Sequence, residues 1–272
     1  MVQKSSRPTV ADIRAMKARG QKISMLYVTT PEEAAAASAA GIHMLSIEGR
    51  FFSPEMRAAA GTCFVQIGLP YGPFGNLVTA EDYLRAAFQF GKIGGDCFYC
   101  AASLEIQKAL CDNAVPVVAH VGLIPSQNTW TGGFKAVGKT AAGAKAVWDH
   151  VKRLEAIGCF GAELEVVPDR VAAVITRSTP IVMLGMGAGP HADAQYLFAE
   201  DVLGHTDGHR PRHAKTYRNF AAEFARLQQE RISAFREFIA DVDSGAYPEP
   251  QHAVPIDDKE FDAFAAAVGV RG

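Results

Sequence analysis

The strongest candidates for chemistry are two glutamates in an apolar run, Ala162-Glu163-Leu164-Glu165-Val166-Val167-Pro168. A carboxylate near the end of a buried strand is costly unless it is paired, hydrogen-bonded or protonated. Such surroundings raise a carboxyl pKa toward the range of a general base, so we predict that Glu165 is the catalytic base. Strand alternation puts Glu163 on the same face, where two carboxyls raise one pKa or bind a cation together. In the alternative, Glu163 points outward and pairs with a helix.

A histidine closes a second apolar run, Val115-Pro-Val-Val-Ala-His120, and a loop containing Gly122 and Pro125 follows. His120 is either a working group at the mouth of a site or a polar residue where a buried strand ends. Parallel strands of a barrel direct their carboxyl ends to one side, where function resides. The other polar side chains expected there are Thr29, Thr30, Glu48, Gln66, Tyr99, His205, Asp207 and His209.

Three other motifs have simpler interpretations. Cys97-Phe-Tyr-Cys100 has the C-x-x-C spacing but lies in an apolar run with no second cysteine pair, so we expect buried small side chains. Gly185-Met-Gly-Ala-Gly189 does not complete a phosphate-loop pattern, and a tight turn explains it as well as anion binding does. The segment with His205 and His209 lacks the spacing of a zinc site, so we expect solvated loop histidines.

The elements that position these residues alternate between strand and helix. Apolar runs typical of buried strands occur at Ile23–Val28, Met44–Glu48, Cys63–Leu69, Cys97–Ala101, Val115–Val121, Ala162–Val167, Ile181–Gly185 and, more weakly, Asp201–Gly204. Helical patterns occur at Pro31–Ala40, Ala80–Ile93, Leu104–Asn113, Ala141–Ile157 and Arg170–Arg177. Such alternation is typical of parallel strands covered by helices. Eight runs predict an α/β fold, a (β/α)8 TIM barrel, rather than an open doubly wound sheet.

Length and composition limit the remaining possibilities. The 272 residues can form one large domain, and we expect a single barrel domain over residues 1–272 with a C-terminal helical extension from about residue 214. The amphipathic Ala214–Val242 would pack across the barrel or against another subunit. A formal net charge of -2 gives no general attraction to nucleic acid or anionic membranes. No apolar run is long enough to span a membrane, and the N-terminus lacks the apolar core of a signal peptide, so we expect a cytoplasmic protein.

One block of sequence carries a family resemblance. Ala114–Gly138, "AVPVVAHVGLIPSQNTWTGGFKAVG", resembles the fifth strand and following loop of the ketopantoate hydroxymethyltransferase (3-methyl-2-oxobutanoate hydroxymethyltransferase) family. The histidine, the Gly-Leu-x-Pro and the Gly-Gly-Phe-Lys are in the family's register. The similarity continues in order through "LEVVP", "PIVMLGMGAG", "GHRPRHAKTYRNF" and "DVDSGAYPEPQHA", at 164–168, 180–189, 208–220 and 241–253.

The resemblance implies a barrel of the phosphoenolpyruvate mutase/isocitrate lyase type and a homo-oligomer, usually a decamer. It implies transfer of a hydroxymethyl group from 5,10-methylenetetrahydrofolate to α-ketoisovalerate, with Mg²⁺ holding the keto acid. The family's base falls on Glu165, and its substrate-contacting histidine falls on His120.

The chain departs from the family where that family binds Mg²⁺. The family's Gly-Asp-Ser corresponds to the run Ser46-Ile-Glu48-Gly-Arg50, which puts Glu48 or Gly49 at the metal-binding aspartate. The second metal-site aspartate corresponds to Gly68, and the Lys-x-Glu of the fourth strand corresponds to Tyr99 and Ala101. A divalent ion that polarises a keto oxygen contributes several kcal/mol, so these losses bear directly on the reaction.

Three functions therefore remain open. The chain retains the family reaction; or it makes or breaks a carbon–carbon bond in another small carboxylate, without metal; or it is a non-catalytic ligand-binding homologue. In the enzymatic cases Glu165 is the base, while His120, Tyr99 and Gly68 contact the substrate and Tyr99 donates a hydrogen bond to an oxyanion. Glu48 is the remaining metal-ligand candidate, and the folate serves as co-substrate only if the family reaction is retained. The expected partners are a small carboxylate and further copies of the chain.

Overall fold

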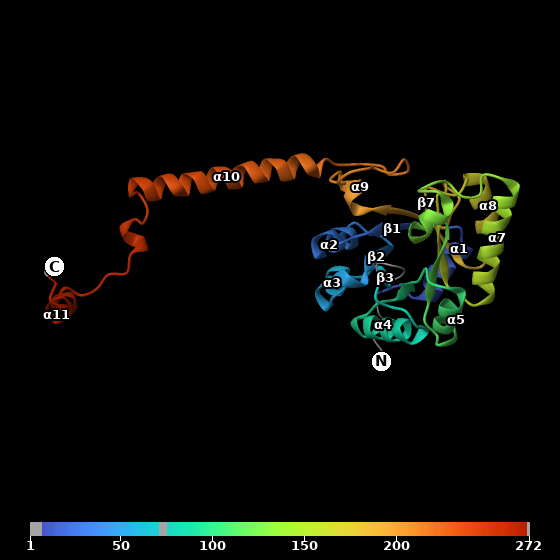
Figure 1. Cartoon of the computed structure of the whole chain (residues 1–272), viewed down its shortest axis with the longest axis horizontal. Coiled ribbons are helices and arrows are strands. Elements are labelled where there is room, and N and C mark those ends of the chain that lie inside the picture. The colour runs from blue at the N-terminus through green and yellow to red at the C-terminus, as the bar shows by residue number, and fades with distance from the viewer. Residues whose placement is uncertain (1–6, 71–74, 271–272) are drawn as a thin grey trace. The chain divides into compact units, whose positions relative to one another are not determined.

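The computed structural model describes residues 7–70 and 75–270, and over these residues eight parallel strands close into one barrel in sequence order (Figure 1). This confirms the predicted (β/α)8 fold. The strands are β1 Ile23–Tyr27, β2 Met44–Glu48, β3 Phe64–Gly68, β4 Cys97–Tyr99, β5 Val117–Gly122, β6 Gly161–Glu165, β7 Val182–Met186 and β8 Ala194–Phe198.

The helices surround the barrel. They are α2 Pro31–Ala39, α3 Pro54–Ala59, α4 Ala80–Ile93, α5 Leu104–Asp112, α6 Asn128–Thr131, α7 Ala141–Ala156, α8 Asp169–Arg177 and α9 Ala199–Leu203. Of these, α2, α3, α4, α5 and α7 begin at a Ser or Thr whose side chain caps the helix. In α4 a capping box is complete, because Thr79 accepts from the backbone N–H of Asp82 and the Asp82 carboxylate accepts in return. That helix has the predicted bounds.

The barrel interior changes character along its axis. At the amino ends of the strands it is apolar, and helix α1 (Val10–Ala18) closes it with Ile13 and Met16. Toward the carboxyl ends the inward positions include Gln66, His120 and Glu163, all buried. A second apolar core lies between the strands and the surrounding helices. Apolar packing therefore accounts for the amino-end half of the interior but not for the buried polar side chains of the carboxyl-end half.

The prediction for the last strand was wrong. Asp201–Gly204 was expected to form it, but β8 is Ala194–Phe198, and residues 199–203 form α9. Asp201 is buried in that short helix and accepts a hydrogen bond from Thr206 at 2.6 Å. Residues 187–193, all described, join β7 to β8 without a helix, so the outer face of β8 tolerates the exposed Gln195. The polar residue interrupts the apolar run that would have marked the strand.

A second compact unit runs from Asn219 and contains α10 (Phe220–Ser244) and α11 (Asp258–Val268). The helix predicted from residue 214 begins at Phe220, where Asn219 caps it. Large apolar side chains of α10 are exposed, among them Phe235, which is 67% exposed, and Ile239. Across the described ranges, we find no helix with the length and apolar character to cross a membrane.

Candidate active site at the carboxyl ends of β5 and β6

The candidate site is built on two neighbouring strands. In the register of β5 and β6, His120 pairs with Glu163, and Gly122 pairs with Glu165. The Glu163 and Glu165 side chains both approach the His120 ring, from opposite sides. The same-face prediction for the two glutamates is confirmed, and the alternative in which Glu163 points outward is wrong.

His120 is held almost completely inside the protein, with 2% of its side chain exposed. Its Nδ1 lies 2.7 Å from the Tyr99 hydroxyl and 3.4 Å from Glu163 Oε2. Its Nε2 lies 3.0 Å from Glu165 Oε2, yet the two atoms are out of line for a hydrogen bond, and no other described residue provides a partner. A buried polar atom left without a partner costs about 1–3 kcal/mol, so Nε2 is suited to bind a further group.

Glu163 lies one layer deeper, in a polar chain that crosses the interior. Gln66 Nε2, on β3, donates to Glu163 Oε1 at 2.8 Å and is 3.1 Å from Ser46 Oγ. Within the described ranges Gln66 Oε1 lacks a hydrogen-bond partner. Burial raises the pKa of the Glu163 carboxyl to about 7, although His120 and Gln66 act in the opposite direction. Ser46 was not predicted; its place between Met44 and Glu48 on alternating inward positions of β2 was the available signal.

Glu165 stands nearer the opening, with 15% of its side chain exposed. Its carbonyl accepts from Leu123 N–H at 2.9 Å, which ties the loop after β5 to the end of β6. The next residue, Val166, has φ +48°, a left-handed conformation that a β-branched residue rarely adopts. Gly122 has φ +88°, and a Cβ there would overlap the Glu165 carbonyl oxygen. The backbone around Glu165 is therefore held by its close contacts with Gly122 and Leu123.

The predicted metal ligand is engaged elsewhere. Glu48 Oε1 accepts from the Tyr27 hydroxyl at 2.8 Å, and Glu48 Oε2 is 2.6 Å from Arg50 Nε. Burial, together with Glu48, raises the pKa of the Tyr27 phenol. Gly68 lies beside Glu48 and Tyr99 in register but offers no side-chain oxygen.

A Mg²⁺ ion does not fit this donor set. In residues 7–70 and 75–270, no group of three or more His, Cys, Asp and Glu side chains is placed to hold a metal. The nearest carboxylate on β2 already forms an ion pair, and the corresponding positions on β3 and β4 carry no carboxylate. A hard cation needs several oxygen ligands.

The structure thus divides the predicted residues into two groups. His120 contacts both Glu165 and Tyr99, and Glu48 and Gly68 are paired in the register of β2 and β3. The weaker candidates lie apart from the first group. His205 is 3.6 Å from Glu33 and His209 is exposed.

The two remaining motifs have structural roles. Cys97 and Cys100 are buried free thiols. The glycine-rich segment after β7 forms the turn toward β8, and Cβ atoms at Gly187 and Gly189 would press on His213 and Asp169. No helix follows it within residues 187–193, so it does not have the strand–loop–helix context of a phosphate loop.

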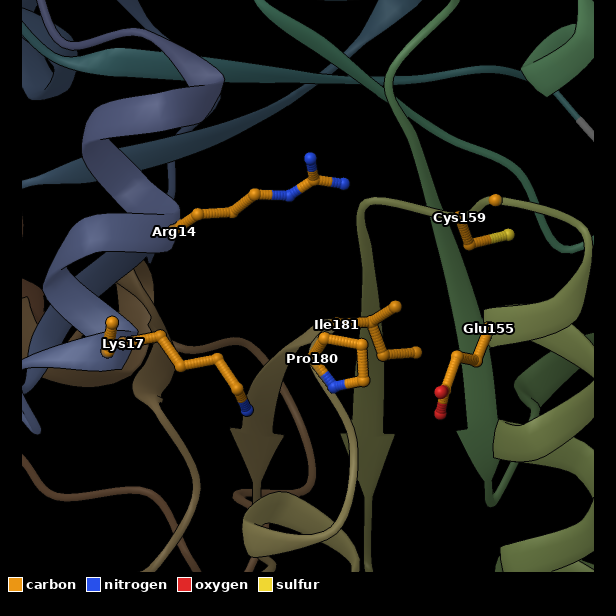
Figure 2. Close-up of a pocket in the computed structure, with 8 residues that line it drawn as sticks. Arg14, Lys17, Glu155, Cys159, Pro180 and Ile181 are labelled. Carbon is orange, nitrogen blue, oxygen red and sulfur yellow. The ribbon is translucent and has the colours of Figure 1, made fainter.

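A pocket of about 570 Å³ lies at the opposite end of the barrel (Figure 2). Arg14 and Lys17 of α1 project into it, and Pro180 and Ile181 line it just before β7. Lys17 already pairs with Asp193 at 2.6 Å. Because catalytic groups of such barrels lie at the carboxyl ends of the strands, this pocket is not the candidate active site.

Comparison with known proteins finds one family that matches most of the chain. Residues 54–250 match the family described as ketopantoate hydroxymethyltransferase. A 3-methyl-2-oxobutanoate hydroxymethyltransferase of Burkholderia mallei is 32% identical over a gapped alignment of 279 positions, and the alignment covers 93% of this chain and 98% of the relative. An enzyme of the same name from Desulfotalea psychrophila is 31% identical over 270 residues, covering 90% and 94%.

Solved structures agree on the fold. A putative lyase/mutase from Burkholderia cenocepacia has a TM-score of 0.50 at 13% identity and covers 97% of this chain and 98% of its own. The carboxyl transferase domain of Rhizobium etli pyruvate carboxylase has a TM-score of 0.53 at 12% identity, covering 71% and 42%.

Proposed function

Because the chain belongs to the ketopantoate hydroxymethyltransferase family, we propose that it acts on a small 2-keto acid or related carboxylate by making or breaking a carbon–carbon bond, with Glu165 as the general base. The observation that carries the proposal is the position of Glu165. Its carboxylate is at the opening of the barrel, 3.0 Å from a buried His120 nitrogen that lacks a hydrogen-bond partner among the described residues.

The chemistry needs a base and a hydrogen-bond donor beside one reacting group. The Glu165 carboxylate removes a proton from the carbon next to the keto group, and the electron pair moves onto the keto oxygen. A donor at His120 Nε2 stabilises that oxygen, because a hydrogen bond in a site closed to water is stronger than one in solvent. The enolate carbon then attacks a one-carbon electrophile, or the reverse steps break such a bond.

A second candidate, a lyase or mutase reaction on a different carboxylate, is favoured by the ends of β2, β3 and β4. Glu48 is held by Tyr27 and Arg50, and Gly68 provides no ligand. The family's Mg²⁺ would hold the keto acid and polarise its oxygen. The residues here do not fit that ion. In the changed reaction, hydrogen-bond donors of the chain itself would therefore stabilise the keto oxygen.

Proton exchange tests the proposal directly. The full chain is incubated with α-ketoisovalerate in D₂O, with and without Mg²⁺, and loss of the C3 proton is followed by NMR. We expect Glu165→Gln to slow exchange about 10²–10⁴-fold, the usual contribution of a general base. Glu81→Gln is the matched control, because Glu81 is a surface glutamate of α4 with 79% of its side chain exposed.

The outcomes separate the candidates. Exchange that requires Mg²⁺ supports the family reaction, and exchange without the ion supports the changed one. If α-ketoisovalerate does not exchange, a panel of other small 2-keto acids is tested in the same way. Exchange of none of them, or a Glu165→Gln variant as fast as the wild type, contradicts the proposal.

A further inference from the structure

The pocket at the amino ends of the strands is lined by side chains of opposite charge from different helices (Figure 2). Its volume of about 570 Å³ lies within the range of about 300–1,000 Å³ that is usual for small-molecule sites. Arg14 and Lys17 project from α1, and Glu155 lines the pocket from α7. The candidate active site is at the other ends of the strands, so the proposed function does not use these groups.

Arg14 has a guanidinium group whose hydrogen-bond donors no described residue uses. It forms no ion pair or hydrogen bond with the described part of the chain, and its guanidinium carbon lies 5.8 Å from the centroid of the Phe160 ring. A cation over an aromatic face is attracted to it while its N–H groups stay available, and in arginine they form a planar fork that matches a carboxylate. The Lys17 ammonium, in contrast, already pairs with Asp193 at 2.6 Å and donates to the Thr176 carbonyl at 3.0 Å.

Glu155 supplies the complementary negative charge. Its Oε2 accepts from Lys152 Nζ at 2.7 Å and from the Thr179 hydroxyl at 3.1 Å, whereas no described residue donates to its Oε1. The hydrogen bond from Lys152 holds the pKa of Glu155 below its usual range, so this carboxyl is ionised at neutral pH. Glu155 and Arg14 line the same pocket without forming an ion pair. A bound molecule can therefore contact both charges.

The rest of the lining is largely apolar. Pro180 and Ile181 line the pocket just before β7, and Cys159 lines it just before β6. The contact with Cys111, together with burial, raises the pKa of the Cys159 thiol, so this group is neutral. Such a lining favours the hydrocarbon part of a ligand. The pocket thus matches a molecule with a carboxylate, an ammonium group and an aliphatic body.

We propose that this pocket binds a small aliphatic amino acid, with its carboxylate on Arg14, its ammonium group on Glu155 Oε1 and its hydrocarbon part on Pro180 and Ile181. Each charge of the ligand then meets an opposite charge of the protein, and the apolar part leaves water. A 2-keto acid lacks the ammonium group, so the pocket differs in ligand class from the candidate active site.

The test is isothermal titration calorimetry of the full chain with L-valine and with 5-aminopentanoate. These two amino acids are isomers, and their charges are close together in the first and far apart in the second. We expect at least one of them to bind. The corresponding acids without the amine, 3-methylbutanoate and pentanoate, should bind at least about tenfold more weakly, because the bond to Glu155 is lost. Glycine should also bind at least about tenfold more weakly, because it lacks the hydrocarbon part.

Substitutions locate the bound molecule. Arg14→Gln and Glu155→Gln should each weaken binding at least about tenfold, since each removes one charge-assisted hydrogen bond. Arg14→Lys keeps the charge and should retain part of the affinity. Arg19→Gln is the matched control for Arg14, because Arg19 ends the same helix and its side chain bonds to Gln21. Glu81→Gln, on the surface of α4, is the control for Glu155. Circular dichroism verifies that each variant is folded.

The outcomes are distinct from those of the exchange assay. Weaker binding in Arg14→Gln and in Glu155→Gln, but in neither control, supports the inference. It is overturned if neither amino acid binds, if an acid without the amine binds as tightly as its parent, or if either pocket variant keeps the wild-type affinity. Glu165→Gln should bind as the wild type does. A loss of binding in that variant would place the ligand at the carboxyl ends of the strands and would also overturn the inference.

Discussion

The buried carboxyl of Glu163 should make the stability of the protein fall as pH rises. Its pKa rises from 4.5 to about 7 on folding, so between these values the folded state binds a proton that the unfolded state has released. The free energy of unfolding therefore decreases through this window and is lowest above it. The rise in pKa, at about 1.36 kcal/mol per pKa unit, corresponds to about 3 kcal/mol.

Glu163→Gln removes this dependence, because the amide has the shape of the protonated acid and never ionises. We expect urea unfolding followed by circular dichroism to show the variant gaining about 3 kcal/mol relative to the wild type between about pH 4.5 and about pH 8. Both proteins are compared at one concentration, since assembly would otherwise alter apparent stability. Glu81→Gln, at an exposed site, should show no such trend. A difference between Glu163→Gln and wild type that does not change with pH would refute the reasoning.

Two other substitutions probe how the site is held. Gly122→Ala should lower the free energy of unfolding by more than about 2 kcal/mol and slow proton exchange, because its Cβ would overlap the Glu165 carbonyl oxygen. Gly133 also has a positive φ, but a Cβ there meets open space. Gly133→Ala should therefore lower the free energy of unfolding by only about 1–2 kcal/mol. Equal losses of melting temperature in the two variants would show that the overlap is relieved without cost. Tyr99→Phe should lower the free energy of unfolding by about 1 kcal/mol, since the hydrogen bond to His120 is lost; a variant that unfolds at the same urea concentration as the wild type would contradict a stabilising role for this hydroxyl at Nδ1.

Much of the fold follows from local patterns. The near-continuous apolar runs of the first seven strands identify strands that are buried on both faces, and the Thr79–Asp82 capping pattern locates the start of α4. The eighth strand was not predicted, because its sequence pattern depends on which of its faces is covered in the folded protein. With no helix in residues 187–193, one face of β8 meets solvent at Gln195, and its pattern becomes alternating rather than apolar.

The site was predictable only in part, for a similar reason. Barrel geometry places Glu165 and His120 at the same end of neighbouring strands, and alternation puts Glu163 and Glu165 on one face. The hydrogen bond from Gln66 to Glu163 joins residues 97 positions apart in sequence, across strands that are not neighbours. Its existence depends on the register around the whole barrel, which no local pattern contains.

The order of strands around the barrel separates two kinds of change. The positions where the chain departs from its family's metal-binding pattern fall at or just beyond the ends of β2, β3 and β4, whereas His120 and Glu165 belong to β5 and β6. The wall of the barrel is thus divided into a substituted arc and a retained arc, which are neighbours at the pair Tyr99 and His120. A barrel arranged in this way can change side chains on one arc while His120 and Glu165 keep their places on the other, and the contacts of Tyr99 with His120 and of Gln66 with Glu163 join the two arcs.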